Sequence, residues 1–334
     1  MNLRLVLPGV ALVLLLAGCT SVPPAAPARA PALPAPVEFW LDLTAGEEAT
    51  DSEVIDDLAT AGAIFVGEAH TIARHHAIQL DLLQKLFLKK VPLVLCLEQL
   101  EARDQPAVDR YSRRETDFAT FAGEIDWPKK WNNYADYRAL CEFARAHRIP
   151  IRALNAPAAT IRAVSRGGGL AKLPPDLRAQ LPAEIFTDDP AYERLLNLEL
   201  AKHMALDPAK LRPVFEAQVA RDETMAAQIV AARRHLAPPD EPRTAFVVLG
   251  AGHMRFGFGT ADRVRRRDSG IVERLVLMTE SGQANVTADQ KAQTRDITIT
   301  HADYRALERR PADYVRVLPR TAAPTLPPGH PPIP

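Results

Sequence analysis

The chain has 334 residues, with 41 basic and 41 acidic side chains and a formal net charge of zero. This balance argues against nucleic acid as a partner, because binding to phosphates needs an excess of Lys and Arg on one surface. The one cationic run, Arg263 to Arg267, is most simply an exposed helix face.

The N-terminus has the pattern of a bacterial export signal. Arg4 precedes an apolar run from Leu5 to Ala17, which is too short to span a bilayer as a helix. Small residues then lead to Cys19, and this ending resembles the lipobox of bacterial lipoproteins. We therefore expect a signal peptide at residues 1–19 and a lipid anchor at Cys19; the alternative is an ordinary cleaved signal. The aspartate that retains such proteins in the inner membrane is absent, which favours the outer membrane, facing the periplasm.

Proline and alanine dominate the residues that follow the signal. We expect an extended tether over residues 20–50, a folded body over 51–318 and a Pro-rich, disordered tail over 319–334. Two cysteines lie in the body. Cys96 is within an apolar run and is expected to be a core thiol, although export leaves a disulfide with Cys141 open.

Strands and helices alternate through the body. Five apolar segments are predicted strands: Ala63 to Val66, Leu93 to Leu97, Ile151 to Leu154, Ala245 to Leu249 and Val272 to Met278. Helical spacing of apolar residues predicts helices at Ile72 to Leu88, Tyr134 to His147 and Arg221 to His235. The alternation predicts an α/β fold, with a mainly parallel sheet flanked by helices. Residues 170–220 have leucines among charges and no convincing strand, which indicates a helical insertion or subdomain.

Polar residues follow the predicted strands at the points where they end. They are Glu68, His70, Glu98, Asn155 and His253. Because the carboxyl ends of parallel strands share one edge of a sheet, we expect these side chains to converge on a crevice and to be capable of ligation or proton transfer. The alternative is that each caps a helix or holds its own loop, which is as good an explanation for Asn155, before Ala156 and Pro157.

Two further features suggest a binding site. His76 shares a helical stripe with apolar residues and could be a core histidine, whereas His75 lies one step round the helix and could reach a ligand or a partner subunit. The segment from Trp127 to Tyr137 has two tryptophans, two tyrosines and two lysines. It could line a pocket for a flat apolar ligand with carboxylates, or it could be an aromatic hinge packed on the sheet.

Taken together, these motifs resemble those of the ChaN-like haem-binding lipoproteins. The matching segments are Gly67 to His70 with His75 and His76, Leu97 and Glu98, Tyr137 and Arg138, Ala153 to Pro157, Arg221 to Ala226, and Gly250 to His253. The resemblance covers roughly Glu53 to Met278. It places the chain in a wider group that includes the Tiki metalloproteases and the erythromycin esterases.

The resemblance implies a lipid-anchored, haem-binding protein of bacterial iron acquisition. A tyrosine would ligate ferric haem, since phenolate is a hard anionic ligand, and a homodimer would complete the crevice. Tyr137 is the first candidate for the ligand and Tyr134 the second. His75, Lys129 and Lys130 are candidates for holding the haem propionates. A haem transport partner would deliver or receive the cargo.

The wider group implies an alternative. Glu68, His70, Glu98 and His253 offer mixed oxygen and nitrogen ligands for zinc or manganese, or acid and base groups. Such a site would make the chain a metal-dependent hydrolase, a peptidase or an esterase, that activates a water molecule.

Overall fold

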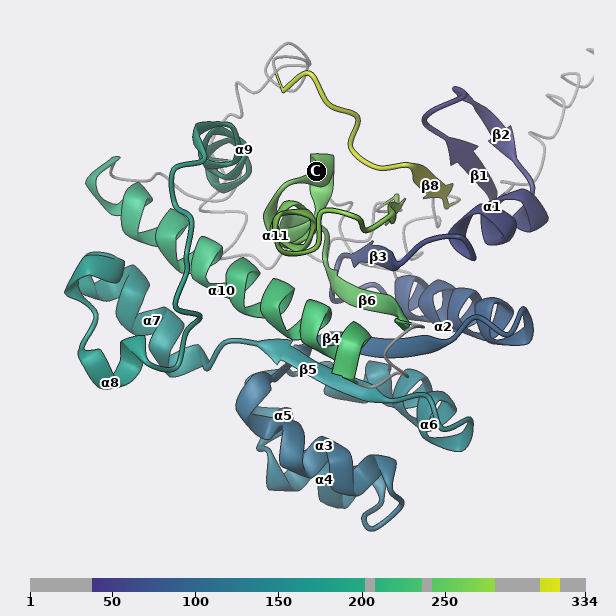
Figure 1. The fold of residues 1–334 in the computed structure, drawn as a ribbon, viewed down its shortest axis with the longest axis horizontal. Coiled ribbons are helices and arrows are strands. Elements are labelled where there is room, and N and C mark those ends of the chain that lie inside the picture. The colour runs from purple at the N-terminus through teal and green to yellow at the C-terminus, as the bar shows by residue number, and fades with distance from the viewer. Residues whose placement is uncertain (1–37, 202–207, 236–241, 280–306, 319–334) are drawn as a thin grey trace, which may run out of the picture. The chain divides into compact units, whose positions relative to one another are not determined.

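In the computed structural model, eight described strands form one sheet in the order β2-β1-β8-β7-β3-β6-β4-β5 (Figure 1). The structure describes residues 38–201, 208–235, 242–279 and 307–318. All of them lie within the unit Val37–Pro334.

The strands differ in direction between the two edges of the sheet. The parallel ones are β3 (Ala63–Glu68), β4 (Leu93–Glu101), β5 (Ile151–Asn155), β6 (Thr244–Gly250), β7 (Glu273–Met278) and β8 (Tyr314–Val317). At the other edge β1 (Phe39–Asp42) pairs antiparallel with β8 and with β2 (Glu47–Ala49). Every residue of β3, β4 and β6 is buried, as expected for parallel strands covered on both faces.

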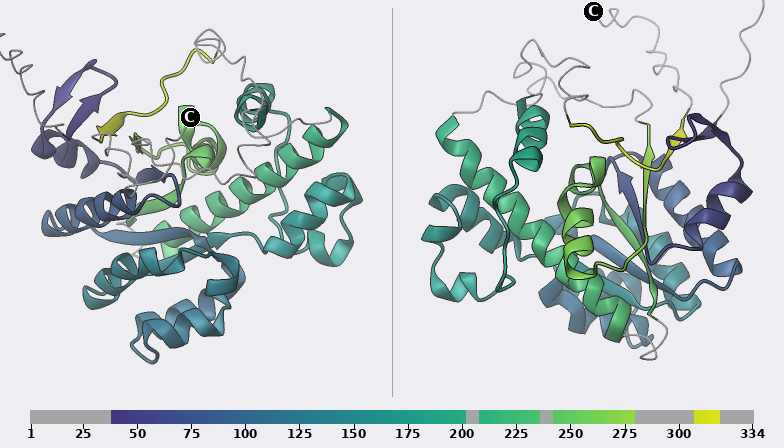
Figure 2. Two further views of the ribbon diagram at one scale, coloured as in Figure 1. Left: turned by 180° about the vertical axis from the view of Figure 1, so that it is seen from behind. Right: turned by 45° about the horizontal axis from the view of Figure 1, so that its top comes forward.

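Helices cover both faces of this sheet (Figure 2). They are α1 (Asp51–Leu58), α2 (Ala73–Leu88), α3 (Gln105–Ser112), α4 (Phe118–Glu124), α5 (Trp127–Lys130), α6 (Arg138–Ala146), α7 (Ala158–Gly167), α8 (Pro175–Arg178), α9 (Pro190–Ala201), α10 (Pro208–His235) and α11 (Gly259–Arg267). Side chains alternate across β3, so Ile64 and Val66 join the core with α1, α2 and α6, while Phe65 joins the core with α10 and α11.

The predicted α/β architecture is confirmed, and each of the five predicted strands is present. The short strands β1, β2 and β8 were not predicted. Because β1 and β2 belong to the sheet, the folded body begins before residue 51, and residues 39–49 are not part of an extended tether. Signal, anchor and tail lie outside the described residues.

The region expected to be a helical insertion contains α8, α9 and the first half of α10, with no strand among its described residues. The sequence predicts a helix that begins at Arg221. In the structure, Arg221 lies in the middle of α10. No helix within the described ranges has the length and apolar character needed to cross a membrane.

The two cysteines of the body are free and buried. Cys96 belongs to the core shared with α10 and α11, and Cys141 belongs to the core on the opposite face of the sheet. The sheet therefore separates the two thiols, which explains why they form no disulfide. Burial raises the pKa of each thiol to about 12, so both are protonated at neutral pH.

Candidate functional site

Glu68, the last residue of β3, is a buried carboxylate surrounded by hydrogen-bond donors. Its Oε1 accepts from Tyr137 Oη at 2.5 Å, from His70 Nδ1 at 2.8 Å and from Gln99 Nε2 at 2.9 Å. Its Oε2 accepts from Gln79 Nε2 at 2.7 Å. Burial would raise the pKa of Glu68, but hydrogen bonds from His70 and His76 outweigh that effect and lower the pKa to about 2.

The carboxylate of Glu68 also orients His70. Because Nδ1 of His70 is bound to Glu68, Nε2 points towards the end of β6. A Cβ atom on Gly250 would lie 2.8 Å from that Nε2, so only glycine fits at this position. The edge of the His70 ring meets Trp131, with 4.8 Å between ring centroids. The His70 side chain is 35 % exposed, which leaves it accessible from solvent.

A second imidazole lies between two acids. His253, in the turn after β6, contacts Asp222 Oδ1 through Nδ1 at 2.7 Å and Glu98 Oε1 through Nε2 at 3.2 Å. Asp222 also accepts hydrogen bonds from Tyr192 Oη at 2.7 Å and from Thr260 Oγ1 at 2.8 Å. Burial would lower the pKa of His253, but the charges of Glu98 and Asp222 outweigh it and raise the pKa to about 9.

Glu98 connects the remaining strand ends. Its Oε2 accepts from the backbone N–H of Gly250 at 2.6 Å, and its Oε1 lies 3.3 Å from Arg221. The side chain of Asn155 donates to the backbone carbonyl of Glu98 at 3.1 Å. Burial favours the neutral acid, yet the charge of His253 and its hydrogen bond hold the pKa of Glu98 well below the usual range.

All five polar residues expected at the strand ends thus lie at one edge of the sheet. In the described part of the chain, no group of three or more His, Cys, Asp or Glu side chains has the geometry to hold a metal ion. What the arrangement offers chemically is two imidazoles, each held by carboxylates, beside a crevice.

The structure contradicts the first choice of haem ligand. Tyr137 is fully buried, and its hydroxyl donates to Glu68. Burial and then the charge of Glu68 raise its pKa far above the usual range, which opposes formation of the phenolate that ferric iron needs. Tyr134 is half-buried, its ring stacks on Phe118 at 6.3 Å, and its hydroxyl makes no hydrogen bond within the described residues.

His75 is also unsuited to its expected role. It is 1 % exposed, accepts a hydrogen bond from the Ala69 N–H at 3.0 Å through Nδ1, and contacts the Thr279 carbonyl at 3.4 Å through Nε2. It therefore holds the turn after β3 rather than a propionate. Its neighbour His76 is buried too, and its Nε2 lies 3.0 Å from the His70 carbonyl.

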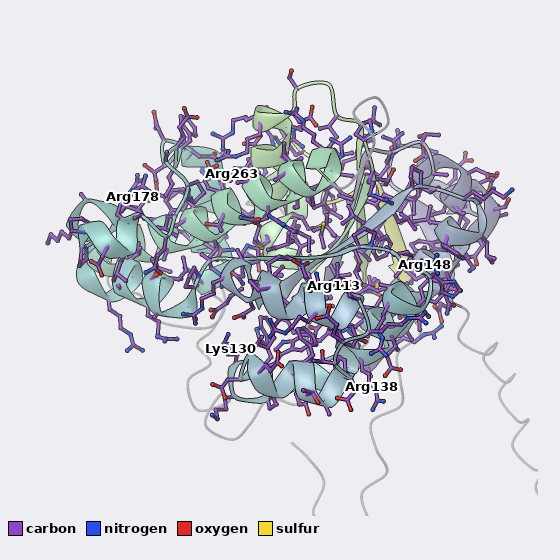
Figure 3. The ribbon with its side chains drawn as sticks, turned by 60° about the horizontal axis from the view of Figure 1, so that its bottom comes forward. Arg113, Lys130, Arg138, Arg148, Arg178 and Arg263 are labelled. Carbon is purple, nitrogen blue, oxygen red and sulfur yellow. The ribbon has the colours of Figure 1, made fainter. Side chains whose placement is uncertain are left out.

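The two candidate lysines differ in exposure, and each is paired with an acid. Lys129 is 80 % exposed and pairs with Asp126, whereas Lys130 is 22 % exposed and pairs with Asp104 at 2.9 Å. Lys130 extends from the short helix α5 (Figure 3). Both lysines, with Trp131, Glu98, Asn155 and Arg221, line a pocket of about 520 Å³ at the ends of β4 and β5.

Several residues of the site were not predicted, among them Arg221, Asp222 and Gln99. The sequence predicts a helix that begins at Arg221, where Arg221 and Asp222 would lie at its N-terminus and were recognised only as part of a motif. In the structure, α10 begins at Pro208, so both residues lie within the helix, next to the ends of the strands. Gln99 follows Glu98 in β4 and supports Glu68 from there. The signal that could have predicted Gln99 is the alternation of side chains along a strand, which puts Gln99 and Glu98 on opposite faces of β4.

Known proteins provide the family context. The family described as "Haem-binding uptake, Tiki superfamily, ChaN" matches residues 54–264. Among solved structures, ChaN of Campylobacter jejuni, reported with cofacial haem binding, has a TM-score of 0.60 and 17% identity over 84% of this chain and 96% of that chain. Similarity at this identity shows a shared fold.

Two further structures have TM-scores too low to support any inference. An erythromycin esterase in its open conformation gives 0.40, with 14% identity over 72% of this chain and 76% of that one. A MARTX toxin effector domain from Vibrio vulnificus gives 0.38, with 14% identity over 74% of this chain and 42% of that one. No curated protein matches the chain.

We predict that His253 makes stability depend on pH. Its native pKa of about 9 exceeds the ordinary value of 6.5, so its contribution is complete below pH 6.5 and is lost as the pH rises to about 9. The loss amounts to about 3 kcal/mol, at about 1.4 kcal/mol per pKa unit. Urea unfolding of wild type and His253→Gln, at pH values from 6 to 10, would measure it.

The exposed His147 supplies the control. His147→Gln should parallel the wild type at every pH. A constant difference in unfolding free energy between wild type and His253→Gln across this range would contradict the prediction.

Proposed function

The chain belongs to the haem-binding uptake family of the Tiki superfamily, the ChaN family, and on that premise we propose that it is a lipid-anchored haem-binding protein of bacterial iron acquisition. The family match over residues 54–264 carries this proposal. The chemistry of the segment from Trp127 to Tyr137 supports it.

This segment presents the groups that ferric haem needs. The hydroxyl of Tyr134 makes no hydrogen bond with a described residue, so no described acceptor competes with the iron for it. The half-buried Trp131 offers an apolar ring to the porphyrin. Lys129 and Lys130 supply positive charge for the two propionates.

Haem on this segment would leave one porphyrin face open to solvent. We propose that a second copy of the chain covers it, so that two haems stack between two subunits, as the cofacial binding in ChaN of Campylobacter jejuni suggests. Burial of the second apolar face would then drive dimerisation.

We predict that Tyr134→Phe weakens ferric haem binding at least about tenfold, because it removes the iron ligand but keeps the ring stacked on Phe118. The tyrosinate band of the absorption spectrum should disappear, and haem should no longer convert monomer to dimer. Absorption titration and gel filtration of the haem-loaded protein would measure both effects.

Tyr137→Phe is the matched control. It removes a hydrogen bond to the Glu68 carboxylate and should destabilise the fold by about 2 kcal/mol while haem affinity is retained. If Tyr137→Phe loses the haem band and Tyr134→Phe keeps it, the assignment of the ligand is reversed.

We also propose that Cys19 carries the lipid that holds the protein at the outer membrane, on its periplasmic side. We predict that Cys19→Ser moves the full-length protein from the membrane fraction of a bacterial host to the soluble fraction, because acyl chains supply the binding energy. The wild type should require detergent for extraction. Retention of Cys19→Ser in the membrane fraction would argue against the lipid anchor.

The strand-end cluster supports a second candidate function, hydrolysis of an ester or amide with His70 as the base. The observation in its favour is the pair of imidazoles oriented by carboxylates, His70 by Glu68 and His253 by Asp222. Nε2 of His70 would take the proton of the attacking water. Burial lowers the pKa of His70, but the hydrogen bond to Glu68 outweighs this and raises the pKa above its ordinary value, so activity should increase as the pH rises through that raised pKa.

We predict that His70→Ala abolishes any hydrolysis of an activated ester but changes haem affinity by no more than about twofold. Asn133 and His76 bond to the backbone carbonyl of residue 70, which alanine retains, so the haem-facing segment keeps these bonds and loses only the ring contact between His70 and Trp131. Rates for wild type, His70→Ala and the surface variant His147→Ala, with haem titrations of each, would test this. Loss of haem binding in His70→Ala would mean that the two sites are one.

A further inference from the structure

Three helices packed in the same core end in the same unusual way. In α2, α3 and α6, the second residue after the helix has a left-handed backbone and is basic each time: Lys90 at φ 62°, Arg114 at φ 66° and Arg148 at φ 57°. Glycine is the usual residue there, because a side chain makes this conformation unfavourable. Strain repeated at three equivalent positions indicates that these side chains have a use.

Hydrogen bonds show that the three helix ends are equivalent. In each, the backbone N–H that follows the basic residue donates to the carbonyl five residues earlier, on Leu86, Arg110 and Ala144, at 3.2, 3.0 and 2.8 Å. Helix α7, which packs against α10, ends with the same bond, from Gly169 to Val164 at 3.0 Å. There the left-handed residue is glycine, at position 168. The chain thus uses the unstrained solution elsewhere.

The three basic residues are exposed and have no acid partner among the residues that the structure describes. By contrast, the residues just before two of them are neutralised. Lys89 pairs with Asp56, and Arg113 pairs with Glu115 at 2.6 Å. Lys89 and Arg113 already place a cation at the negative end of the dipoles of α2 and α3. The left-handed cations are therefore in excess of what the helices need.

The three helix ends form one continuous surface, which we call the cationic face. Arg114 donates to the backbone carbonyl of Ala146, at the end of α6, at 3.3 Å. The ring of His147 contacts the ring of Phe87, near the end of α2, with 4.5 Å between centroids. Helices α2 and α6 accordingly end on the same side of the molecule (Figure 1). Beside these cations, the side chain of Leu88 is 77 % exposed.

The cationic face also contains a hollow. The ends of α3 and α6 border a volume of about 360 Å³, which is lined by Arg114, Arg138 and Arg145 and by the acids Asp117 and Glu142. Three guanidinium groups and two carboxylates leave a net positive charge. Because a guanidinium group matches the geometry of phosphate oxygens, the hollow suits a phosphate group.

We propose that the cationic face rests on a membrane of anionic phospholipid, with Leu88 among the headgroups and a lipid phosphate in the hollow. This inference rests on the lipid anchor proposed above, which keeps the body near a bilayer. Residues 20–37, between Cys19 and the described body, reach about 60 Å at full extension, so the anchor alone permits any orientation. The unpaired cations select one orientation, because each gains free energy near an anionic surface.

This orientation turns the haem-facing segment away from the bilayer. Helix α6 begins at the end of that segment, at Arg138, and ends at the cationic face, at Ala146. Helices α2 and α6 lead into β4 and β5, so they end at the opposite edge of the sheet from the polar strand ends. Haem, or a protein that delivers it, would therefore approach from the aqueous side.

The test uses the full-length, haem-free protein with its lipid, reconstituted in vesicles, and measures acylation of single lysines by mass spectrometry. With equal parts of phosphatidylcholine and phosphatidylglycerol, Lys90 should react at least about fivefold more slowly than with phosphatidylcholine alone. Lys129, which is 80 % exposed in the haem-facing segment, should react equally in both. High salt should remove the protection of Lys90.

Two charge-matched variants complete the design. Arg148→Gln should reduce the protection of Lys90 at least about twofold, whereas Arg166→Gln, at an exposed position of α7, should leave it unchanged. Arg148→Gly should reduce the protection as well, but it should raise the urea midpoint of unfolding, because glycine relieves the left-handed backbone.

Equal acylation of Lys90 in the two kinds of vesicle, or protection of Lys129 instead, would overturn the proposal. A lower urea midpoint for Arg148→Gly than for wild type would also count against it, because the side chain would then serve the helix itself. Flotation with phosphatidylcholine vesicles tests the anchor separately. Loss of that flotation would reject the anchor, whereas flotation without protection of Lys90 would reject only the role of the cationic face.

Discussion

The structure depends on one buried negative charge. Glu68 ends the central strand β3 with 3 % of its surface exposed, and an isolated carboxylate there would be prohibitively unstable. It is tolerated because donors from β4, α2 and the turn before α6 surround it, through Gln99, Gln79 and Tyr137. Each of these elements is therefore held to β3 by a polar contact as well as by apolar packing, and His70 inherits its orientation from the same carboxylate.

A similar arrangement stabilises the neighbouring strand ends. Glu98 and Asp222 are both buried, and the imidazolium of His253 lies between them and compensates their charges. Removing one member of such a group leaves its partners as uncompensated buried charges, which is usually more harmful than replacing the whole group. This interdependence links β4, β6 and α10 although they are distant in sequence.

The sheet core and the convergence at the strand ends were predictable because both follow from local pattern. β3 and β6 are apolar runs that are easily recognised as buried strands. The residues that follow parallel strands must all lie at the same edge of the sheet. The edge strands were missed because β2 (Glu47–Ala49) has no apolar alternation and owes its conformation to pairing with β1. The sequence pattern favours Tyr137 as haem ligand because it does not reveal that this side chain is buried in the fold. The role of Asp222 was not predictable because it depends on where the long helix α10 begins.

One backbone carbonyl joins two regions of the chain. The oxygen of His70 receives hydrogen bonds from His76, in α2, and from Asn133, in the aromatic segment. The two regions that could carry function therefore share an acceptor, and neither can move without the other losing a bond. A substitution of Asn133 would therefore disturb the turn after β3, although Asn133 bonds to the backbone carbonyl of His70 and not to its ring.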